Sequence, residues 1–260
     1  MKIVVSNFCY HCLNDDQSNY TELREKLKKD NKLDIEIELN SENEYFIECE
    51  NGHTQALKLQ AENFEILFDL ATLALIDGYS KEAFSTLYSS YERFIEFTIK
   101  IICHSKSIKK EEFIKGWNLV KKQSERQLGA FYIIQLIEFG KIEFELPKKW
   151  IEIRNQVIHN GEIPPSKKVI EFGNELLNFI NGVLEKLNEK YPNSLSVRQR
   201  KWLDSKSDKY FNSQIYASSL IPTIIGLNSL NFSLQNKETY EEIIELVKDN
   251  GFYKSFYSKK

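Results

Sequence analysis

Three cysteines and a histidine near the start of the chain fall into two short pairs. Cys9 and Cys12 form a Cys-x2-Cys pair. Cys49 and His53 form a Cys-x3-His pair, and Gly52 permits a tight turn between them. Zinc takes four nitrogen or sulfur ligands in a tetrahedron, commonly as two close pairs from two turns. We expect these four side chains to bind a structural zinc ion, since four protein ligands leave no position for a reacting water.

The region from about residue 5 to residue 55 resembles a zinc ribbon. The 36 residues between the two pairs make a longer insert than a ribbon usually has. His11 lies inside the first pair and is an alternative ligand. The competing interpretation is that the four side chains simply pack together in a small core.

A second group of residues has the chemistry of phosphate cleavage. Arg154 and His159 are separated by four residues, and Asn155 directly follows the arginine. A histidine can exchange protons near neutral pH, and a guanidinium can stabilise negative charge that develops on a phosphate. Five residues turn a helix by about 140°, so Arg154 and His159 share no face. They converge only if the helix loosens at residues 160–161, or if each faces a partner chain.

The segment from Trp150 to Gly161 resembles the Arg-x4–6-His signature of the HEPN superfamily. The helical pattern from about residue 57 to residue 188 is similar to the HEPN bundle, over about half of the chain. The resemblance implies a metal-independent endoribonuclease with RNA as its substrate. It also implies a homodimer in which two Arg–His pairs line one cleft. Proteins of this kind resemble bacterial toxins and antiviral effectors, so an antitoxin or a sensor protein is a further expected partner.

Four other polar residues are candidates for supporting roles. Asn155 is expected to orient the phosphate or the histidine. Glu92 is a candidate for a supporting contact, although the Lys-Arg that follows such an acid in some HEPN nucleases is absent. Lys148 and Lys149 are candidates for binding the RNA backbone. The structural alternatives are an ion pair of Arg154 with a nearby glutamate, a helix cap at His159, and solvated lysines.

The composition is that of an ordinary globular protein. The chain has 260 residues, of which 42% are hydrophobic and 28% charged. A net charge of −3 and only four cysteines argue against a disulfide-stapled domain and a strongly basic coat protein. No signal peptide and no long apolar stretch is evident, so we expect a cytoplasmic location and no membrane contact. No Gly-rich phosphate loop or nucleophile elbow offers a competing chemistry.

The elements that must position these residues can be predicted from hydrophobic periodicity. Alternation at residues 33–39 and an apolar run at 45–49 predict a hairpin, with a short helix at 20–27. A 3.6-residue period then predicts helices at 57–77, 80–104, 111–123, 127–140, 147–160, 167–189 and 239–250. The expected fold is mainly α. It has a zinc-ribbon-like α/β module at 1–55, a HEPN-like helical bundle at 56–192 and a helical C-terminal extension at 193–260.

Three functional interpretations stay open at this point. The first is the endoribonuclease. The second is a non-catalytic HEPN scaffold that binds RNA or a nucleotide, or holds a dimer together, while the zinc module recruits a partner. The third is a toxin silenced by an antitoxin or by nucleotidyl modification of tyrosines near the site.

Overall fold

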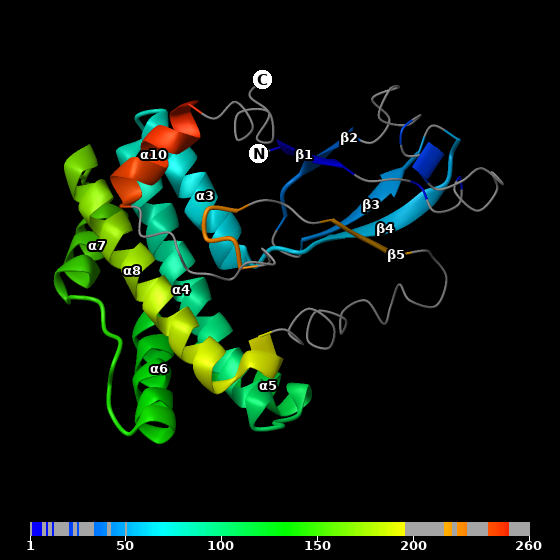
Figure 1. Cartoon of the computed structure of the whole chain (residues 1–260). Coiled ribbons are helices and arrows are strands. Elements are labelled where there is room, and N and C mark those ends of the chain that lie inside the picture. Colours follow the sequence, from blue (N-terminus) through cyan, green and yellow to red (C-terminus); the bar gives the residue numbers. More distant parts are fainter. Residues whose placement is uncertain are drawn as a thin grey trace. The chain divides into compact units, whose positions relative to one another are not determined.

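The chain is mainly helical and divides into two compact units, each built from separate segments. The computed structural model describes residues 2–6, 9, 12, 21, 22, 25, 34–40, 43–49, 51–195, 216–219, 223–227 and 239–249 (Figure 1). The first unit takes residues 1–61, 203–222 and 245–260. The second takes residues 62–202 and 223–244.

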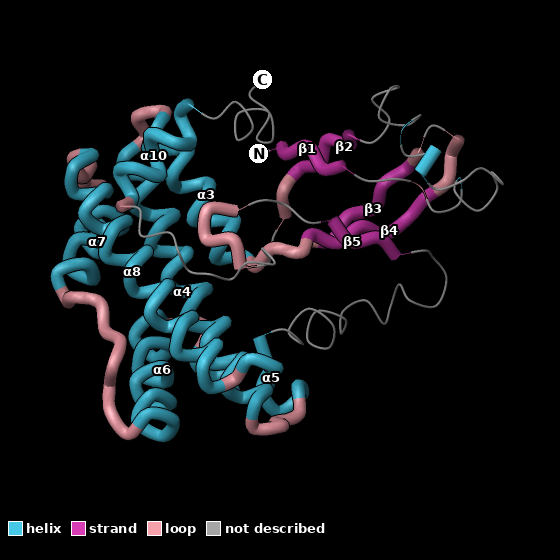
Figure 2. The backbone as a smooth tube through the Cα atoms, viewed as in Figure 1, coloured by secondary structure: helices cyan, strands magenta, loops and turns pink. Residues whose placement is uncertain are grey.

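The described strands of the first unit form two small sheets (Figure 2). β1 (Lys2–Ser6) pairs antiparallel with β2 (Asp34–Glu38). β3 (Glu44–Glu48) pairs antiparallel with β4 (Thr54–Leu59). β5 (Tyr216–Ser219), from near the other end of the chain, adds to β4 in parallel.

Two expectations for the first unit are wrong. The runs at 33–39 and 45–49 do not pair as a hairpin, because β2 pairs with β1 and β3 pairs with β4. Residues 54–59 form β4 and are not the start of a helix, and the expected boundary after residue 55 falls inside this strand. In the expected helix at 20–27, the described residues Thr21, Glu22 and Glu25 are helical, and the others lie outside the described residues.

The helices of the second unit confirm most of the expected helical pattern. They are α3 (Asn63–Ile76), α4 (Ser80–Ser105), α5 (Lys110–Val120), α6 (Ser124–Phe139), α7 (Lys149–His159) and α8 (Ser166–Lys190). α4 is central, because α3, α5, α6, α7 and α8 all pack against it. In the C-terminal extension, α10 (Tyr240–Asp249) confirms the helix expected there, whereas β5 shows that the extension is not wholly helical.

An aromatic core fixes α7 in the bundle. Trp150 is fully buried, with its ring 4.9 Å from that of Phe172 and 6.3 Å from that of Phe84. Its indole N–H donates to Glu175 Oε2 at 2.6 Å, so the buried polar atom has a partner. Val157, two turns later on the same face, is also buried. These contacts set which side of α7 points into the protein.

Gln135 holds the segment between α6 and α7 in place. Its side chain is completely buried, donates to the carbonyl of Phe144 and accepts the backbone N–H groups of Glu143 and Phe144. Phe144 then lies against Gly182 of α8, where an added Cβ would come within 3.0 Å of its ring. The α6–α7 connection is therefore an ordered part of the fold.

Two buried carboxylates on α3 bind the segment at residues 223–227. Glu65 accepts hydrogen bonds from the Thr223 hydroxyl and the Leu227 N–H, both at 2.9 Å. Asp69 accepts the N–H of Ile224 at 3.0 Å. Both side chains are 1% exposed. A buried charge is tolerated when such donors surround it, so these bonds tie a distant segment to α3.

The start of α10 docks on α3 and α8 through one tyrosine. Tyr240 is fully buried, its ring lies edge-on to Phe68, and its hydroxyl is 3.0 Å from that of Thr72. A Cβ at Gly173 would lie 2.2 Å from the Tyr240 ring, so only glycine allows this approach. None of the described helices combines the length and apolar character that a membrane span requires.

Candidate functional site

The two cysteine and histidine pairs come together in the first unit. The Sγ atoms of Cys12 and Cys49 are 3.7 Å apart, too far for a disulfide bond of about 2.05 Å. His53 Nδ1 lies 3.8, 3.3 and 3.7 Å from the sulfur atoms of Cys9, Cys12 and Cys49. All four ligand atoms lie within 4.8 Å of one another. The four expected ligands therefore form one Cys3His cluster that can hold a metal ion.

The spacing of this cluster suits a tetrahedral ion. With Zn–S at about 2.3 Å and Zn–N at about 2.0 Å, tetrahedral ligand atoms lie about 3.5–3.8 Å apart. Four of the six separations are 3.3–3.8 Å, near those edges, and all six are at most 4.8 Å. The alternative ligand His11 lies outside the described residues.

The turn between β3 and β4 places Cys49 and His53. The N–H of Gly52 donates to the carbonyl of Cys49, and the N–H of Cys49 donates to the carbonyl of His53. Gly52 has a φ of +78°, which residues with a Cβ rarely adopt. Asn51 donates its side-chain N–H to Cys12 Sγ at 3.2 Å. The sequence analysis did not single out Asn51, although its place between two ligands was a usable signal.

Local hydrogen bonds and burial give the thiols of Cys12 and Cys49 different pKa values. Burial opposes ionisation of Cys49, but hydrogen bonds from the backbone N–H groups of Asn51 and His53, together with those from the Cys12 and Cys9 thiols, outweigh it and lower the pKa to about 7. Burial dominates at Cys12 and raises its pKa to about 11.

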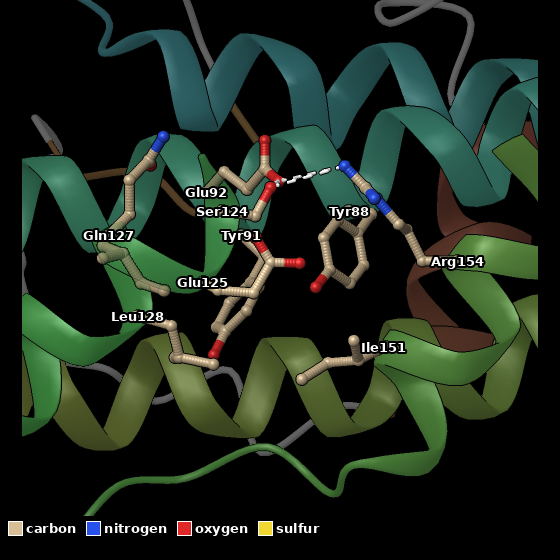
Figure 3. Close-up of a pocket in the computed structure, with 10 residues that line it drawn as sticks. Tyr88, Tyr91, Glu92, Ser124, Glu125, Gln127, Leu128, Ile151 and Arg154 are labelled. Carbon is tan, nitrogen blue, oxygen red and sulfur yellow. Dashed lines mark hydrogen bonds and ion pairs between the residues drawn. The ribbon is translucent and has the colours of Figure 1, made fainter. Parts of the chain in front are cut away.

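Arg154 lies at a second site, between α4, α6 and α7. Its guanidinium donates to Ser124 Oγ at 3.4 Å and forms an ion pair with Glu92 at 3.9 Å. It also lies over the Tyr88 ring, 5.6 Å from the centroid. Figure 3 shows the side chain pointing from α7 towards Glu92 and Ser124. The arginine side chain is 23% exposed, so its charge sits in a partly enclosed polar network.

A small pocket opens beside this network. It is lined by residues of α4, α6 and α7, namely Tyr88, Tyr91, Glu92, Ile95, Ser124, Glu125, Gln127, Leu128, Ile151 and Arg154 (Figure 3). Burial, together with the charge of Glu92, raises the pKa of Tyr88 to about 12. Its hydroxyl therefore stays protonated at neutral pH and can donate a hydrogen bond.

Asn155 and His159 lie towards solvent on α7, and Asn155 Oδ1 also accepts a hydrogen bond from the Arg154 guanidinium at 3.0 Å. Both are exposed, and a spacing of four residues puts them on one face. The helix stays regular through His159, because the N–H of Asn160 still donates to the carbonyl of Gln156. The loosening at residues 160–161 therefore comes too late to turn the histidine towards Arg154. Within one chain the structure does not bring Arg154 and His159 together.

The other expected site residues have mixed surroundings. Glu92 lies beside Arg154 and also accepts the Ser124 hydroxyl at 2.5 Å. Lys148 is exposed just before α7. Lys149 is engaged within the protein by Glu171 and Glu175, at 2.6 and 2.9 Å. Sequence reasoning missed Ser124 and Tyr88, because neither residue lies near the α7 motif in the sequence.

Comparison with protein-family models, curated proteins and solved structures finds no match for this chain. The HEPN resemblance therefore stays a prediction, and the functional argument rests on the two sites described above.

Proposed function

We propose that this protein is a metal-independent endoribonuclease of the HEPN type, with Arg154, Asn155 and His159 as its catalytic residues. The observation that carries the proposal is the arrangement of α7. That helix holds a partly enclosed arginine beside a pocket, and it presents an amide and an imidazole on its exposed face.

The proposed reaction needs one proton acceptor, one proton donor and a positive charge. The 2′-oxygen attacks the phosphorus while its proton passes to a base, and the P–O5′ bond breaks as the leaving oxygen takes up a proton. The products are a 2′,3′-cyclic phosphate and a 5′-hydroxyl. His159 is suited to proton exchange, because an imidazole can both accept and donate a proton. Arg154 and Asn155 would hold the phosphate.

A second copy of the chain completes the proposed site. Arg154 lies on the inner side of α7 and His159 on the outer side, about 140° apart. A shared cleft therefore takes its arginine and its histidine from two chains. In the cell this activity would arrest growth, and an antitoxin or a sensor protein would control it. The proposal does not rest on Lys148 or Lys149 as RNA ligands.

We further propose that the Cys3His cluster holds zinc in a structural role. The four protein atoms would fill all four tetrahedral positions, and the separations of 3.3 and 3.7 Å are near those expected around zinc. The ion would tie the segment at Cys9 and Cys12 to the turn between β3 and β4. It would not take part in the cleavage step.

The decisive experiment compares wild type with His159→Ala. We expect the histidine variant to cut RNA at least about 100-fold more slowly, because a proton-transfer group is lost. The purified proteins are incubated with total RNA without added divalent ions, and the RNA ends are analysed for cyclic phosphate. No chelator is added, since it would also attack the Cys3His cluster. In parallel, induced expression is scored for growth arrest.

Gln156→Ala is the matched control, because Gln156 is exposed on the same helix and has no role in the proposed reaction. It should cut RNA and arrest growth as wild type does. Equal cutting by wild type and His159→Ala would refute the catalytic assignment.

One observation favours a non-catalytic scaffold as the second candidate. The guanidinium of Arg154 is turned inward and paired with Glu92, as in a structural ion pair. On that interpretation the bundle binds RNA or a nucleotide, or holds a dimer, and the Cys3His module recruits a partner. Arg154→Ala would then lower the free energy of unfolding, while wild type would leave RNA intact.

A further inference from the structure

α6 is apolar on two opposite faces, and only one of them is used within the chain. Its inner face buries Gln127, Phe131 and Gln135. Its outer face exposes Ile133 by 58%, Leu136 by 44% and Ile137 by 74%. Three neighbouring apolar side chains on one helical face are a costly arrangement in water. We propose that this outer face binds the same face of a second copy, with the two α6 helices antiparallel and Ile133 at the two-fold axis.

The sequence of the outer face is complementary to itself. The N-terminal half of the face carries Gly129 and Ala130, and the C-terminal half carries Leu136 and Ile137. When two antiparallel helices cross at Ile133, Gly129 meets the partner's Leu136 and Ala130 meets the partner's Ile137. Small residues then face large ones on both sides of the axis, which is how helix surfaces interdigitate.

Gly129 supports this close approach. A glycine inside a helix costs about 1 kcal/mol relative to alanine. Nothing lies within 4 Å of the Cβ that an alanine would carry there, so no contact within the described chain accounts for the glycine. A neighbouring helix that packs onto this spot does account for it, because the missing side chain makes room for a large one.

The size and polarity of the face also fit a second copy. Between Ala130 and Ile137 its exposed surface carries no charged side chain, as expected at the centre of an interface. α6 is about 24 Å long, so one helix per chain covers less than the roughly 800 Å² per partner of a standard interface. We therefore expect a reversible dimer with a dissociation constant in the micromolar range.

This dimer is independent of the proposed ribonuclease activity. Arg154 lies at the N-terminal end of α6, through its bond with Ser124. In the antiparallel pair the two Ser124 residues are about 27 Å apart along the helix axis. The α6 contact therefore does not form the shared cleft, and its tests measure association without reference to cleavage.

Sedimentation velocity of the full chain across the micromolar range tests the proposal. Wild type should show a concentration-dependent association step that Ile137→Glu lacks over the same range, whether or not two chains also share the α7 cleft. Leu119→Glu on α5 is the matched control, because Leu119 is 73% exposed and Ile137 is 74% exposed. It should dimerise as wild type does.

The variant Gly129→Leu distinguishes specific pairing of the two α6 helices from non-specific hydrophobic association. The added side chain has open space within one chain, raises helix propensity and makes the face more apolar. If the face associated non-specifically, this variant would associate more strongly. The proposal expects at least about a tenfold weaker dimer, because the cavity for the partner's Leu136 is filled.

Oxidative crosslinking locates the axis. Ile133→Cys should give a 133–133 disulfide between two chains, identified by mass spectrometry, and Leu119→Cys should give none. The proposal is overturned if wild type does not associate, if Ile137→Glu shows the same association steps as wild type, or if another part of the same chain crosslinks to position 133.

Discussion

Each residue of the Cys3His cluster offers one ligand atom, and the side chain of Asn51 contacts one of these atoms, Cys12 Sγ. Asn51 donates to Cys12 Sγ, and such outer contacts orient metal ligands and adjust their basicity. The fourth cysteine of the chain, Cys103, lies on α4 in the second unit. It therefore provides an internal comparison for every cysteine substitution in the cluster.

Cys49→Ser should weaken metal binding by roughly 100-fold or more, because a serine hydroxyl replaces a thiolate in the ligand set. Cys103→Ser should bind as wild type does. Bound metal is measured by elemental analysis and by competition with a coloured chelator. Equal metal loss in the two variants, or full retention in Cys49→Ser, would contradict the ligand assignment.

At the scale of single residues, sequence predicted what is encoded locally. The four expected metal ligands lie in two short pairs, and each pair can be recognised in the sequence without knowledge of the fold. The residues that surround Arg154 could be predicted only in part from the sequence. Glu92 was a candidate, but Ser124 lies 30 residues before the arginine on another helix, and only packing brings the two side chains together.

One buried glutamate, Glu138, links the C-terminal ends of three helices, α4, α6 and α8. Glu138 on α6 is 4% exposed and forms ion pairs with Lys106 after α4 and Lys190 at the end of α8, at 3.0 and 3.4 Å. It also accepts the Tyr191 hydroxyl. Burial alone would raise the pKa of the Glu138 carboxyl, but these hydrogen bonds outweigh burial and lower it.

The lowered pKa of Glu138 predicts a pH dependence of stability. An unfolded glutamate has a pKa of about 4.3, and the folded value lies below it. The carboxylate therefore stabilises the fold above about pH 4.3, and this contribution is lost as the pH falls through the folded pKa. Glu138→Gln should lower the free energy of unfolding at pH 7, and the difference from wild type should shrink towards pH 3.

Urea unfolding of both proteins at a series of pH values measures this difference. Glu189→Gln is the control, because Glu189 is 76% exposed and its ion pair with Lys186 is a surface one. A deficit of Glu138→Gln that stays constant down to pH 3 would contradict the proposed charge contribution.

Elements with regular periodicity were predicted well, and β4 was not. α4 and α8 show long apolar stripes, and α10 begins with a capping box between Thr239 and Glu242. In β4 the positions from Gln55 to Leu59 are all buried, including Lys58, which pairs with Glu44 at 2.8 Å. Without alternation, a buried strand cannot be told from a buried helix by pattern alone.

Across the whole molecule, both units combine segments that are separated in the sequence. β5 completes a sheet whose other strands lie about 160 residues earlier, and residues 223–227 bind carboxylates of α3. Neither pairing can be predicted from the local sequence, because each depends on which distant segment supplies the hydrogen bonds. The expected division at residue 193 could not anticipate them.

A chain that ends after residue 195 should lose about 3 kcal/mol or more of unfolding free energy. Glu65 and Asp69 would keep their charges and lose three donors, each worth about 1.5–3 kcal/mol when bonded to a charged group. Thermal and urea unfolding of the second unit measure the loss.

The double substitution Glu65→Gln with Asp69→Asn should have opposite effects in the two chains. In the short chain it should restore part of the stability, because neutral amides tolerate lost donors better than charges do. In the full chain it should destabilise. The same sign in both chains would contradict the argument.

The interleaved segments also set an order of events during synthesis. Domains commonly fold one after another as the chain leaves the ribosome. Here β5 of the first unit and the first turn of α10 in the second unit both follow residue 215, so neither unit can be completed before these segments have been made. A ribosome that carries this nascent chain therefore does not meet the folded units until it has translated past the start of α10.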